Sequence, residues 1–269
     1  MDRSASSLTD ELARFRLDGR VAIVTGATGG IGSRLAHALS RVGASVAVHG
    51  RDESRAAGMV ERLRAEGADA VPVIADLTRR EEADRMVEET LAAFGRVDVI
   101  VNTVGGGAGT ALYPAESYPE TEWDRIMDLN LGAIVRPTSA AARAMIAGGR
   151  GGRVLHFSSV RGQLGIDNGF SAYVAAKGAL DALTRQQATE WAKHGITVNA
   201  LSPTFVATPQ VASLLADEEF RAGLERRIPL GRIADTDDVV GAALLLCSDA
   251  SSFITGQVLT LDGGLTACQ

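Results

Sequence analysis

The chain has 269 residues, of which 46% are hydrophobic, and a formal net charge of −6. This acidic balance disfavours nucleic acid as a main partner, because phosphate backbones are bound by clustered Lys and Arg. The N-terminal sequence lacks a signal-peptide core, and no run reaches the roughly 18 uncharged apolar residues of a membrane span, so we expect a cytoplasmic protein with no membrane segment.

Apolar strand-like runs alternate with amphipathic helical runs along the chain. A short helix is expected in an N-terminal extension, residues 1–16, and a single domain over 17–269. Strands are predicted at 20–25, 44–50, 70–76, 97–102, 152–159, 196–202 and 257–263. Helices are predicted at 31–43, 53–67, 80–95, 121–147, 171–194 and 235–248. Apolar strands separated by helices indicate a doubly wound (Rossmann) α/β fold, with a parallel sheet of about seven strands covered on both faces.

A glycine-rich turn, VTGATGGIG at 24–32, joins the first predicted strand to the first helix. Gly26, Gly30 and Gly32 can take positive φ and let the backbone approach a ligand closely. The helix that follows presents free N–H groups and a partial positive charge to a phosphate. A purely structural turn could use glycines too, but its place in the first βαβ unit favours a dinucleotide-binding turn.

The stretch YVAAK places Tyr173 and Lys177 one turn apart on the same face of a predicted helix. A nearby ammonium favours phenolate, so we expect Lys177 to lower the pKa of Tyr173 from its usual value of about 10. A phenol that ionises near working pH can pass a proton to or from an alcohol. For this motif alone, a core tyrosine beside a snorkelling lysine remains the alternative.

The T-G-x-x-x-G-x-G spacing of Thr25 to Gly32, the YVAAK stretch and a serine pair at 158–159 together resemble the short-chain dehydrogenase/reductase family, in its one-domain subclass. The likeness spans about residues 17–266. It implies reversible hydride transfer between a nicotinamide cofactor and a carbonyl or secondary alcohol. In that reaction Tyr173 moves the hydroxyl proton, and Lys177 tunes Tyr173 and bonds to the nicotinamide ribose. Asn130, in IMDLNLGA, matches the asparagine that helps to hold a water near the lysine.

The second serine of the pair, Ser159, matches the family serine that hydrogen-bonds the substrate oxygen. Its distance from Tyr173 along the chain, 173 − 159 = 14 residues, is about one longer than the family pattern suggests. A one-residue insertion in the loop 160–172 would explain this spacing, and Ser158 is the alternative.

The resemblance also implies a set of cofactor-binding positions. They are Gly26, Thr28, Gly30, Ile31, Gly32, Arg51, Asp76, Leu77, Asn102, Tyr173, Lys177, Pro203 and Thr208. NAD-specific sites place a carboxylate at the end of the second strand, where this chain has Gly50 and Arg51, which suit a 2′-phosphate. NADP(H) is therefore expected, with NAD(H) as the alternative because Asp52 and Glu53 follow. Asp76 matches the aspartate at the adenine ring, or it caps a helix.

Two motifs depart from the family pattern. The sequence NTVG at 102–105 stands where N-N-A-G is common, and Pro203-Thr204 stands where P-G is common. Neither change touches the proposed acid/base groups, so they bear on substrate detail. Cys247 and Cys268 form no ligand or disulfide pattern and the four histidines lack ligand spacing, so no metal is expected.

Residues 204–228 form a polar, charged segment that we expect to be a mobile lid over the substrate. Arg161 and three lid residues, Arg221, Arg226 and Arg227, are candidate anion contacts, and solvated surface charge is the alternative.

The tail GAALLLCSDASSFITGQVLTLDGG and the stretch LGID resemble gluconate 5-dehydrogenases, which favours a polyol or keto-sugar acid as substrate. They also resemble 3-oxoacyl-carrier-protein reductases, so a thioester substrate is the alternative. A non-catalytic NADP(H)-sensing module is an alternative of another class, against which the intact Ser159, Tyr173 and Lys177 argue. The family resemblance further implies a homotetramer, formed through the two long middle helices and the last strand.

Overall fold

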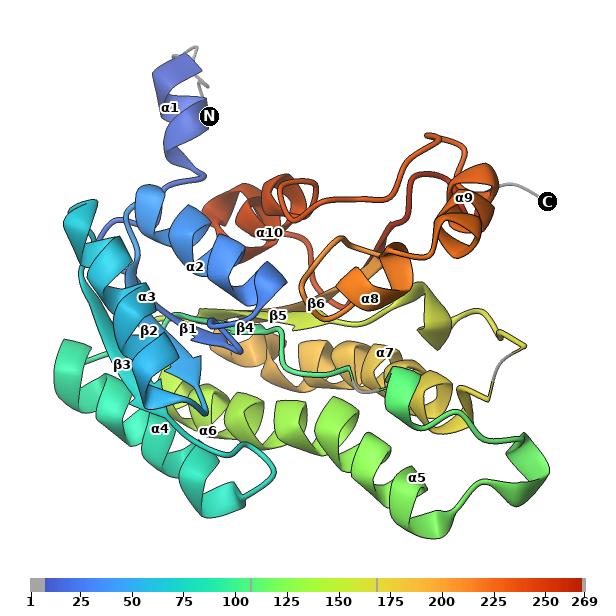
Figure 1. Cartoon of the computed structure of the whole chain (residues 1–269). Coiled ribbons are helices and arrows are strands. Elements are labelled where there is room, and N and C mark those ends of the chain that lie inside the picture. The colour runs from blue at the N-terminus through green and yellow to red at the C-terminus, as the bar shows by residue number, and fades with distance from the viewer. Residues whose placement is uncertain (1–7, 107, 168, 268–269) are drawn as a thin grey trace.

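One parallel sheet organises the chain (Figure 1). The computed structural model describes residues 8–106, 108–167 and 169–267, and within them seven strands lie in the order β3-β2-β1-β4-β5-β6-β7. The strands are β1 Val21–Thr25, β2 Ser45–Gly50, β3 Ala70–Ile74, β4 Val99–Asn102, β5 Gly152–Phe157, β6 Ile196–Pro203 and β7 Val258–Leu261. The predicted doubly wound α/β fold is confirmed, and Pro72 lies in the edge strand β3, where a missing N–H costs no ladder bond.

Helices cover both faces of the sheet. They are α1 Leu8–Ala13, α2 Gly30–Arg41, α3 Glu53–Ala65, α4 Arg80–Phe94, α5 Glu120–Met127, α6 Ala133–Gly148, α7 Ser171–Trp191, α8 Ala212–Leu215, α9 Glu218–Arg227 and α10 Val240–Cys247. Helices α2, α3 and α10 contribute to one apolar core, and α4, α6 and α7 to a second core on the opposite face. Strands buried between two helical layers explain why the strand sequences are apolar throughout.

The helix predicted over 121–147 is interrupted. A π-helical segment, Asp128–Gly132, separates α5 from α6, and Asn130 lies in its middle. Such π segments insert an extra residue into a helix and redirect nearby side chains, often at functional sites. The sequence pattern missed this break because the apolar spacing on both sides remains helical.

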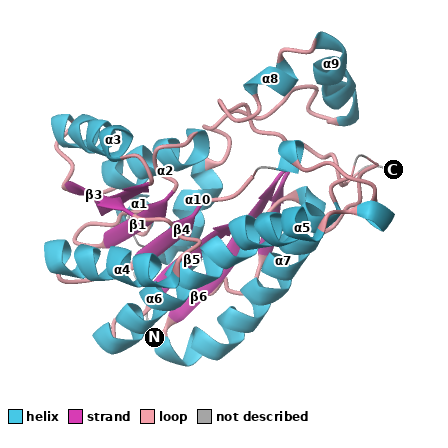
Figure 2. Cartoon of the chain, turned by 60° about the horizontal axis from the view of Figure 1, so that its bottom comes forward, coloured by secondary structure: helices cyan, strands magenta, loops and turns pink. Residues whose placement is uncertain are grey.

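Residues predicted as a lid contain the two short helices α8 and α9, which project from the sheet (Figure 2). The segment is attached at its base, where the amide of Ala207 donates to the carbonyl of Ala234 at 2.8 Å. Phe205 and Phe220 meet edge to face, with ring centroids 5.7 Å apart. Its mobility stays a prediction.

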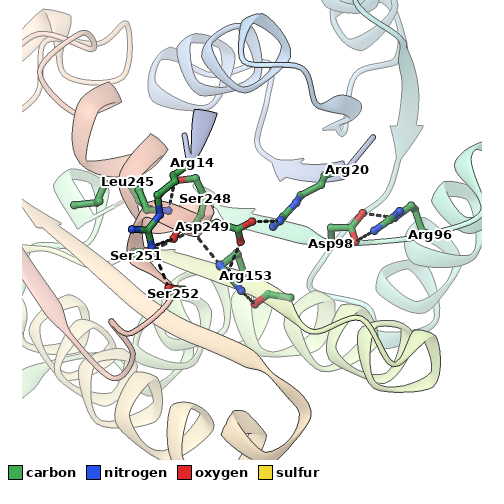
Figure 3. A network of polar contacts seen from close by, with 12 residues as sticks. Arg14, Arg20, Arg96, Asp98, Arg153, Leu245, Ser248, Asp249, Ser251 and Ser252 are labelled. Carbon is green, nitrogen blue, oxygen red and sulfur yellow. Dashed lines mark hydrogen bonds and ion pairs between the residues drawn. The ribbon is translucent and has the colours of Figure 1, made fainter. Parts of the chain in front are cut away.

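The amino edge of the sheet carries a network of paired charges (Figure 3). Asp249 forms ion pairs with Arg20, which precedes β1, and with Arg153 in β5 at 2.8 Å. The buried Arg153 also donates from Nε to the carbonyl of Ser248 at 3.2 Å. Arg14, directly after α1, donates to the carbonyl of Asp249 at 3.0 Å and so ties the N-terminal helix to the domain. The short helix expected in the extension is thus present as α1.

In the described part of the chain, no helix is long and apolar enough to cross a membrane. Cys247 is buried in α10, and desolvation raises the pKa of its thiol to about 12, so it behaves as an unreactive apolar side chain. Cys268 lies outside the described residues.

Candidate active site

The proposed catalytic residues meet at the carboxyl edge of the sheet. Ser159 follows β5, Tyr173 and Lys177 lie in the first half of α7, and Asn130 belongs to the π segment. A Cβ built on Gly105, in the loop after β4, would lie 2.9 Å from Asn130 Oδ1 and 3.5 Å from Lys177 Nζ. The fold therefore brings four residues together that are up to 47 positions apart (177 − 130).

The two serines of the pair face different partners. Ser159 lies beside the Tyr173 phenol and opposes the rise of its pKa. Ser158 donates to the carbonyl of Lys177 at 3.4 Å and lies near Asp181, on the inner side of α7. Alternating side-chain directions at the end of an extended strand explain this division. Of the two candidates, Ser159 is the one that can share a substrate oxygen with Tyr173.

The pKa of Tyr173 differs from the sequence-based expectation, which is wrong for this structure. Desolvation raises it above 10.0, and the opposing groups are first Ser159 and then the positive charge of Arg161. The ammonium of Lys177 lies 5.6 Å from the centroid of the Tyr173 ring and donates to the carbonyl of Phe157 at 2.8 Å. Burial outweighs the neighbouring charge, a balance that spacing along a helix cannot reveal.

Lys177 itself is 3% exposed, and burial lowers its pKa from 10.5 to about 8. Asp181, one turn further along α7, partly opposes this fall. Desolvation in turn raises the pKa of Asp181, whose Oδ1 is buried without a hydrogen-bond partner. Lys177 therefore titrates within a range that an enzyme can use, under the control of a buried carboxyl group.

Asn130 is fully buried, and its amide group is engaged by the backbone. Oδ1 accepts from the amide of Gly106 at 2.7 Å, and Nδ2 donates to the carbonyls of Gly106 and Ile126 at 2.9 and 3.0 Å. It thereby fixes the loop after β4 against the π segment. The family role expected for Asn130, holding a water near Lys177, stays a prediction.

The glycine-rich turn packs closely at the start of α2. Gly26 has φ of 69°, and its amide donates to His49 Nδ1 at 3.0 Å. A Cβ on Gly32 would lie 2.2 Å from the Gly26 carbonyl oxygen, and one on Gly30 would lie 2.7 Å from Thr208 Cγ2. Only glycines allow this close approach at the start of α2, whose first-turn amides remain free to bind an anion.

Comparison with known proteins agrees with this geometry. A family model described as enoyl-(acyl carrier protein) reductase matches residues 26–266. Gluconate 5-dehydrogenase of Gluconobacter oxydans is 38% identical over 252 residues, which cover 94% of this chain and 96% of that protein. The crystal structure of a gluconate 5-dehydrogenase from Burkholderia cenocepacia in complex with NADP and tartrate superposes with a TM-score of 0.90, at 36% identity and with 96% and 99% of the two chains covered. A short-chain type dehydrogenase/reductase from Mycobacterium marinum superposes with a TM-score of 0.89, at 32% identity, with 96% and 100% covered.

The chain belongs to the short-chain dehydrogenase/reductase family. The family resemblance seen in the sequence is therefore confirmed. The departures at 102–105 and at Pro203-Thr204 are local, since the chain covers almost the full length of each of these relatives.

At the corner after β2, the acidic and basic side chains that left the choice between NADP(H) and NAD(H) open have different partners. Asp52 caps α3, with its Oδ1 accepting from the amide of Arg55 at 2.9 Å. Arg51 is exposed and acts electrostatically on Asp76, whose pKa is lowered mainly by a hydrogen bond from Thr78. Arg55 donates to the carbonyl of Thr28 at 2.7 Å, so a second guanidinium, which the sequence analysis missed, reaches the same corner.

The remaining predicted cofactor positions lie around the glycine-rich turn and differ in how far they are buried. Asn102 and Leu77 are buried, and Pro203 is the last residue of β6, paired in register with Leu261. Thr208 lies over Gly30. The loop between β6 and α8 thus crosses the mouth of the glycine-rich turn, and binding roles for all of these positions stay predictions.

A buried polar chain behind the site was not found from the sequence. Asn102 Nδ2 donates to Thr138 Oγ1 at 2.9 Å and lies 3.2 Å from His156 Nδ1, while His156 Nε2 meets Gln187 Oε1 at 3.1 Å. Burial lowers the pKa of His156 to about 4, so the ring is neutral and can link the two amide side chains. The sequence signal that could have revealed this chain is a polar residue in each of two otherwise apolar strands, Asn102 in β4 and His156 in β5. In the described residues, no cluster of three His, Cys, Asp or Glu side chains is arranged to hold a metal ion.

Proposed function

We propose that the protein interconverts a keto-sugar acid and its hydroxy acid, in the manner of a gluconate 5-dehydrogenase, with NADP(H) as the cofactor. The observation that carries this proposal is the placement of Ser159 and Lys177 beside Tyr173, at the same edge of the sheet as the glycine-rich turn before α2. The similarity to gluconate 5-dehydrogenases, one of them crystallised with NADP and tartrate, supports the substrate and cofactor class.

The residues of this chain have separate tasks in the proposed reaction. When bound, NADP(H) supplies or accepts the hydride. Tyr173 gives a proton to the carbonyl oxygen or removes one from the hydroxyl, and Ser159 polarises the same oxygen by donating a hydrogen bond. Lys177 supplies positive charge beside Tyr173. Because the pKa of Tyr173 is raised in this pocket, its phenol is protonated at neutral pH and is ready to act as the acid in carbonyl reduction.

For the cofactor, we propose that Arg51 and Arg55 receive the 2′-phosphate of NADP(H), because Asp52 is committed to capping α3. We expect Arg51→Ala to raise KM for NADPH by about tenfold and to leave KM for NADH within about twofold, a loss typical of one charged contact. Steady-state kinetics with both cofactors measure this difference. Equal losses with NADPH and NADH would contradict the assignment.

The direct test is an assay of 5-keto-D-gluconate reduction with NADPH, followed by absorbance of the reduced cofactor. Acetoacetyl thioester serves as the second substrate, because the sequence also resembles 3-oxoacyl-carrier-protein reductases and this compound is a 3-oxoacyl thioester. Preference for the thioester would replace the sugar-acid proposal, and absence of turnover with both would leave the non-catalytic module as the better explanation. A homotetramer and a cytoplasmic location stay predictions, and light scattering coupled to size-exclusion chromatography measures the first.

A further inference from the structure

Arg161 is a buried cation without an acidic partner. It is 8% exposed and lies in the short 3-10 turn η4, Val160–Gly162, directly after Ser159. Nη1 donates to the carbonyl of Gly165 at 3.0 Å, but no carboxylate among the described residues forms an ion pair with the guanidinium. Burying a charge without a counter-charge costs free energy, so a position like this is rarely kept for packing alone.

The position of Arg161 places it beside the proposed chemistry. Its amide donates to Ser159 Oγ at 3.2 Å, and its positive charge lowers the pKa of Tyr173. The turn η4 lies tightly against α7, since a Cβ on Gly162 would lie 3.1 Å from the carbonyl oxygen of Lys177. The turn that carries Arg161 is therefore held next to Ser159 and against the helix that carries Tyr173 and Lys177.

The guanidinium group of Arg227 acts electrostatically on that of Arg161. Arg227, the exposed last residue of the lid helix α9, lowers the pKa of Arg161 through its like charge. No ion pair joins Arg227 to a carboxylate of the described residues either. Among the described residues, the buried Arg161 guanidinium donates only to the carbonyl of Gly165, so its other N–H groups can donate to a carboxylate in planar, paired hydrogen bonds.

We propose that Arg161 binds the carboxylate of the substrate, supported by the positive charge of Arg227, and thereby selects an acid over a neutral ketone. This inference rests on the proposed function, because it names the residues that choose the substrate class. A phosphate of the cofactor is the less suitable anion: the glycine-rich turn follows β1, whereas Arg161 follows β5, and β4 lies between these strands in the sheet.

Binding of a hydroxy acid tests the site without turnover. Wild-type protein is heated with D-gluconate, with the neutral polyol D-glucitol, or with sodium chloride at equal ionic strength. At about tenfold over its dissociation constant, gluconate should raise Tm by about 3 °C, and the other two additives should not. Arg161→Met should abolish the rise, while Arg226→Met, a change at the neighbouring exposed arginine of α9, should keep it.

Kinetics separate recognition from catalysis. Arg161→Met should lower kcat/KM for 5-keto-D-gluconate by about 10²-fold, mostly through KM, and leave kcat/KM for the neutral ketose L-sorbose within about threefold. Arg227→Met should cost about tenfold with the acid, because Arg227 is exposed. Arg161→Lys should recover part of the acid activity, since it keeps the charge but loses the planar pairing.

Several outcomes would overturn the proposal. Gluconate and glucitol raising Tm equally in the wild type would remove the anion site. Equal kcat/KM losses with the acid and the neutral ketose in Arg161→Met, together with a shifted pH profile, would instead make Arg161 a residue that tunes Tyr173. The proposed function is tested separately from the anion site. Gluconate binding without reduction of any carbonyl would support the anion site and contradict the proposed function. Reduction of L-sorbose without gluconate binding would support carbonyl reduction and contradict the anion site.

Discussion

Arg153 and Arg161 lie at opposite ends of β5 and are equally buried, at 8% exposed each, yet their surroundings differ. Burial lowers the pKa of both guanidinium groups. At the amino edge, Asp249 opposes this shift for Arg153 through an ion pair, whereas at the carboxyl edge Arg227 adds to it for Arg161. At one end of the strand a carboxylate lies beside the buried guanidinium group, and at the other end no carboxylate of the described residues does.

This contrast extends along both edges of the sheet. At the amino edge, acidic and basic side chains pair and also bond to the backbone, as Asp98 does with Arg96 and with the amide of Val21. At the carboxyl edge, Lys177 is desolvated and Asp181 has an unpaired oxygen. We therefore expect substitutions at the amino edge to change stability and those at the carboxyl edge to change activity.

The largest effect is expected at the carboxyl edge. Tyr173→Phe removes the proposed acid/base hydroxyl and should lower kcat by about 10³-fold, while the free energy of unfolding changes by less than about 1 kcal/mol. Steady-state kinetics and urea denaturation measure the two quantities. Tyr113→Phe, in the same aromatic cluster, is the control and should keep kcat within about twofold. Carbonyl reduction that survives Tyr173→Phe would contradict the proposed mechanism.

At the amino edge, Asp249→Asn leaves Arg153 buried without a counter-charge. We expect a loss of about 2 kcal/mol in unfolding free energy, less than the roughly 3–5 kcal/mol of fully buried pairs, because the Asp249 side chain is 47% exposed. KM and kcat should stay near the wild-type values. A stable variant with impaired kinetics would reverse the proposed division between the two edges.

A smaller effect, visible only in the pH profile, is expected for Asp181→Asn. The Asp181 carboxylate raises the pKa of Lys177, so its removal should move that pKa below about 8. Activity that requires the ammonium should then be lost at lower pH than in the wild type. The pH dependence of kcat/KM measures this alkaline limb, and an unchanged limb with a lowered maximum would indicate a purely structural role for Asp181.

The smallest effect is expected for Arg14→Ala. Arg14 is exposed and joins α1 to the turn at Asp249 through hydrogen bonds, so its loss should cost no more than about 0.5 kcal/mol and should leave kcat unchanged. Thermal unfolding and steady-state kinetics measure both. A change in kcat would link the N-terminal extension to the site at the far edge of the sheet.

Most of the fold could be predicted from local sequence patterns. The seven strands and the turn before α2 follow from apolar periodicity and glycine spacing, which depend on neighbours along the chain. The π segment around Asn130 was missed because one extra residue in a helix leaves the flanking periodicity intact. The start of α10 at Val240, later than the predicted 235, reflects a turn in which Asp235 accepts from the amide of Asp237 at 2.7 Å.

The sequence by itself determined the family, the doubly wound sheet and the residues that can carry chemistry, because each of these rests on short motifs and their spacing. Only the tertiary structure decided that Ser159 rather than Ser158 faces Tyr173, that desolvation raises the pKa of Tyr173, and that no acid of the described residues pairs with Arg161. These properties depend on which side chains from distant parts of the chain are buried together and on how much water they exclude. Neither the contacts nor the desolvation can be inferred from the residues of a single helix or strand.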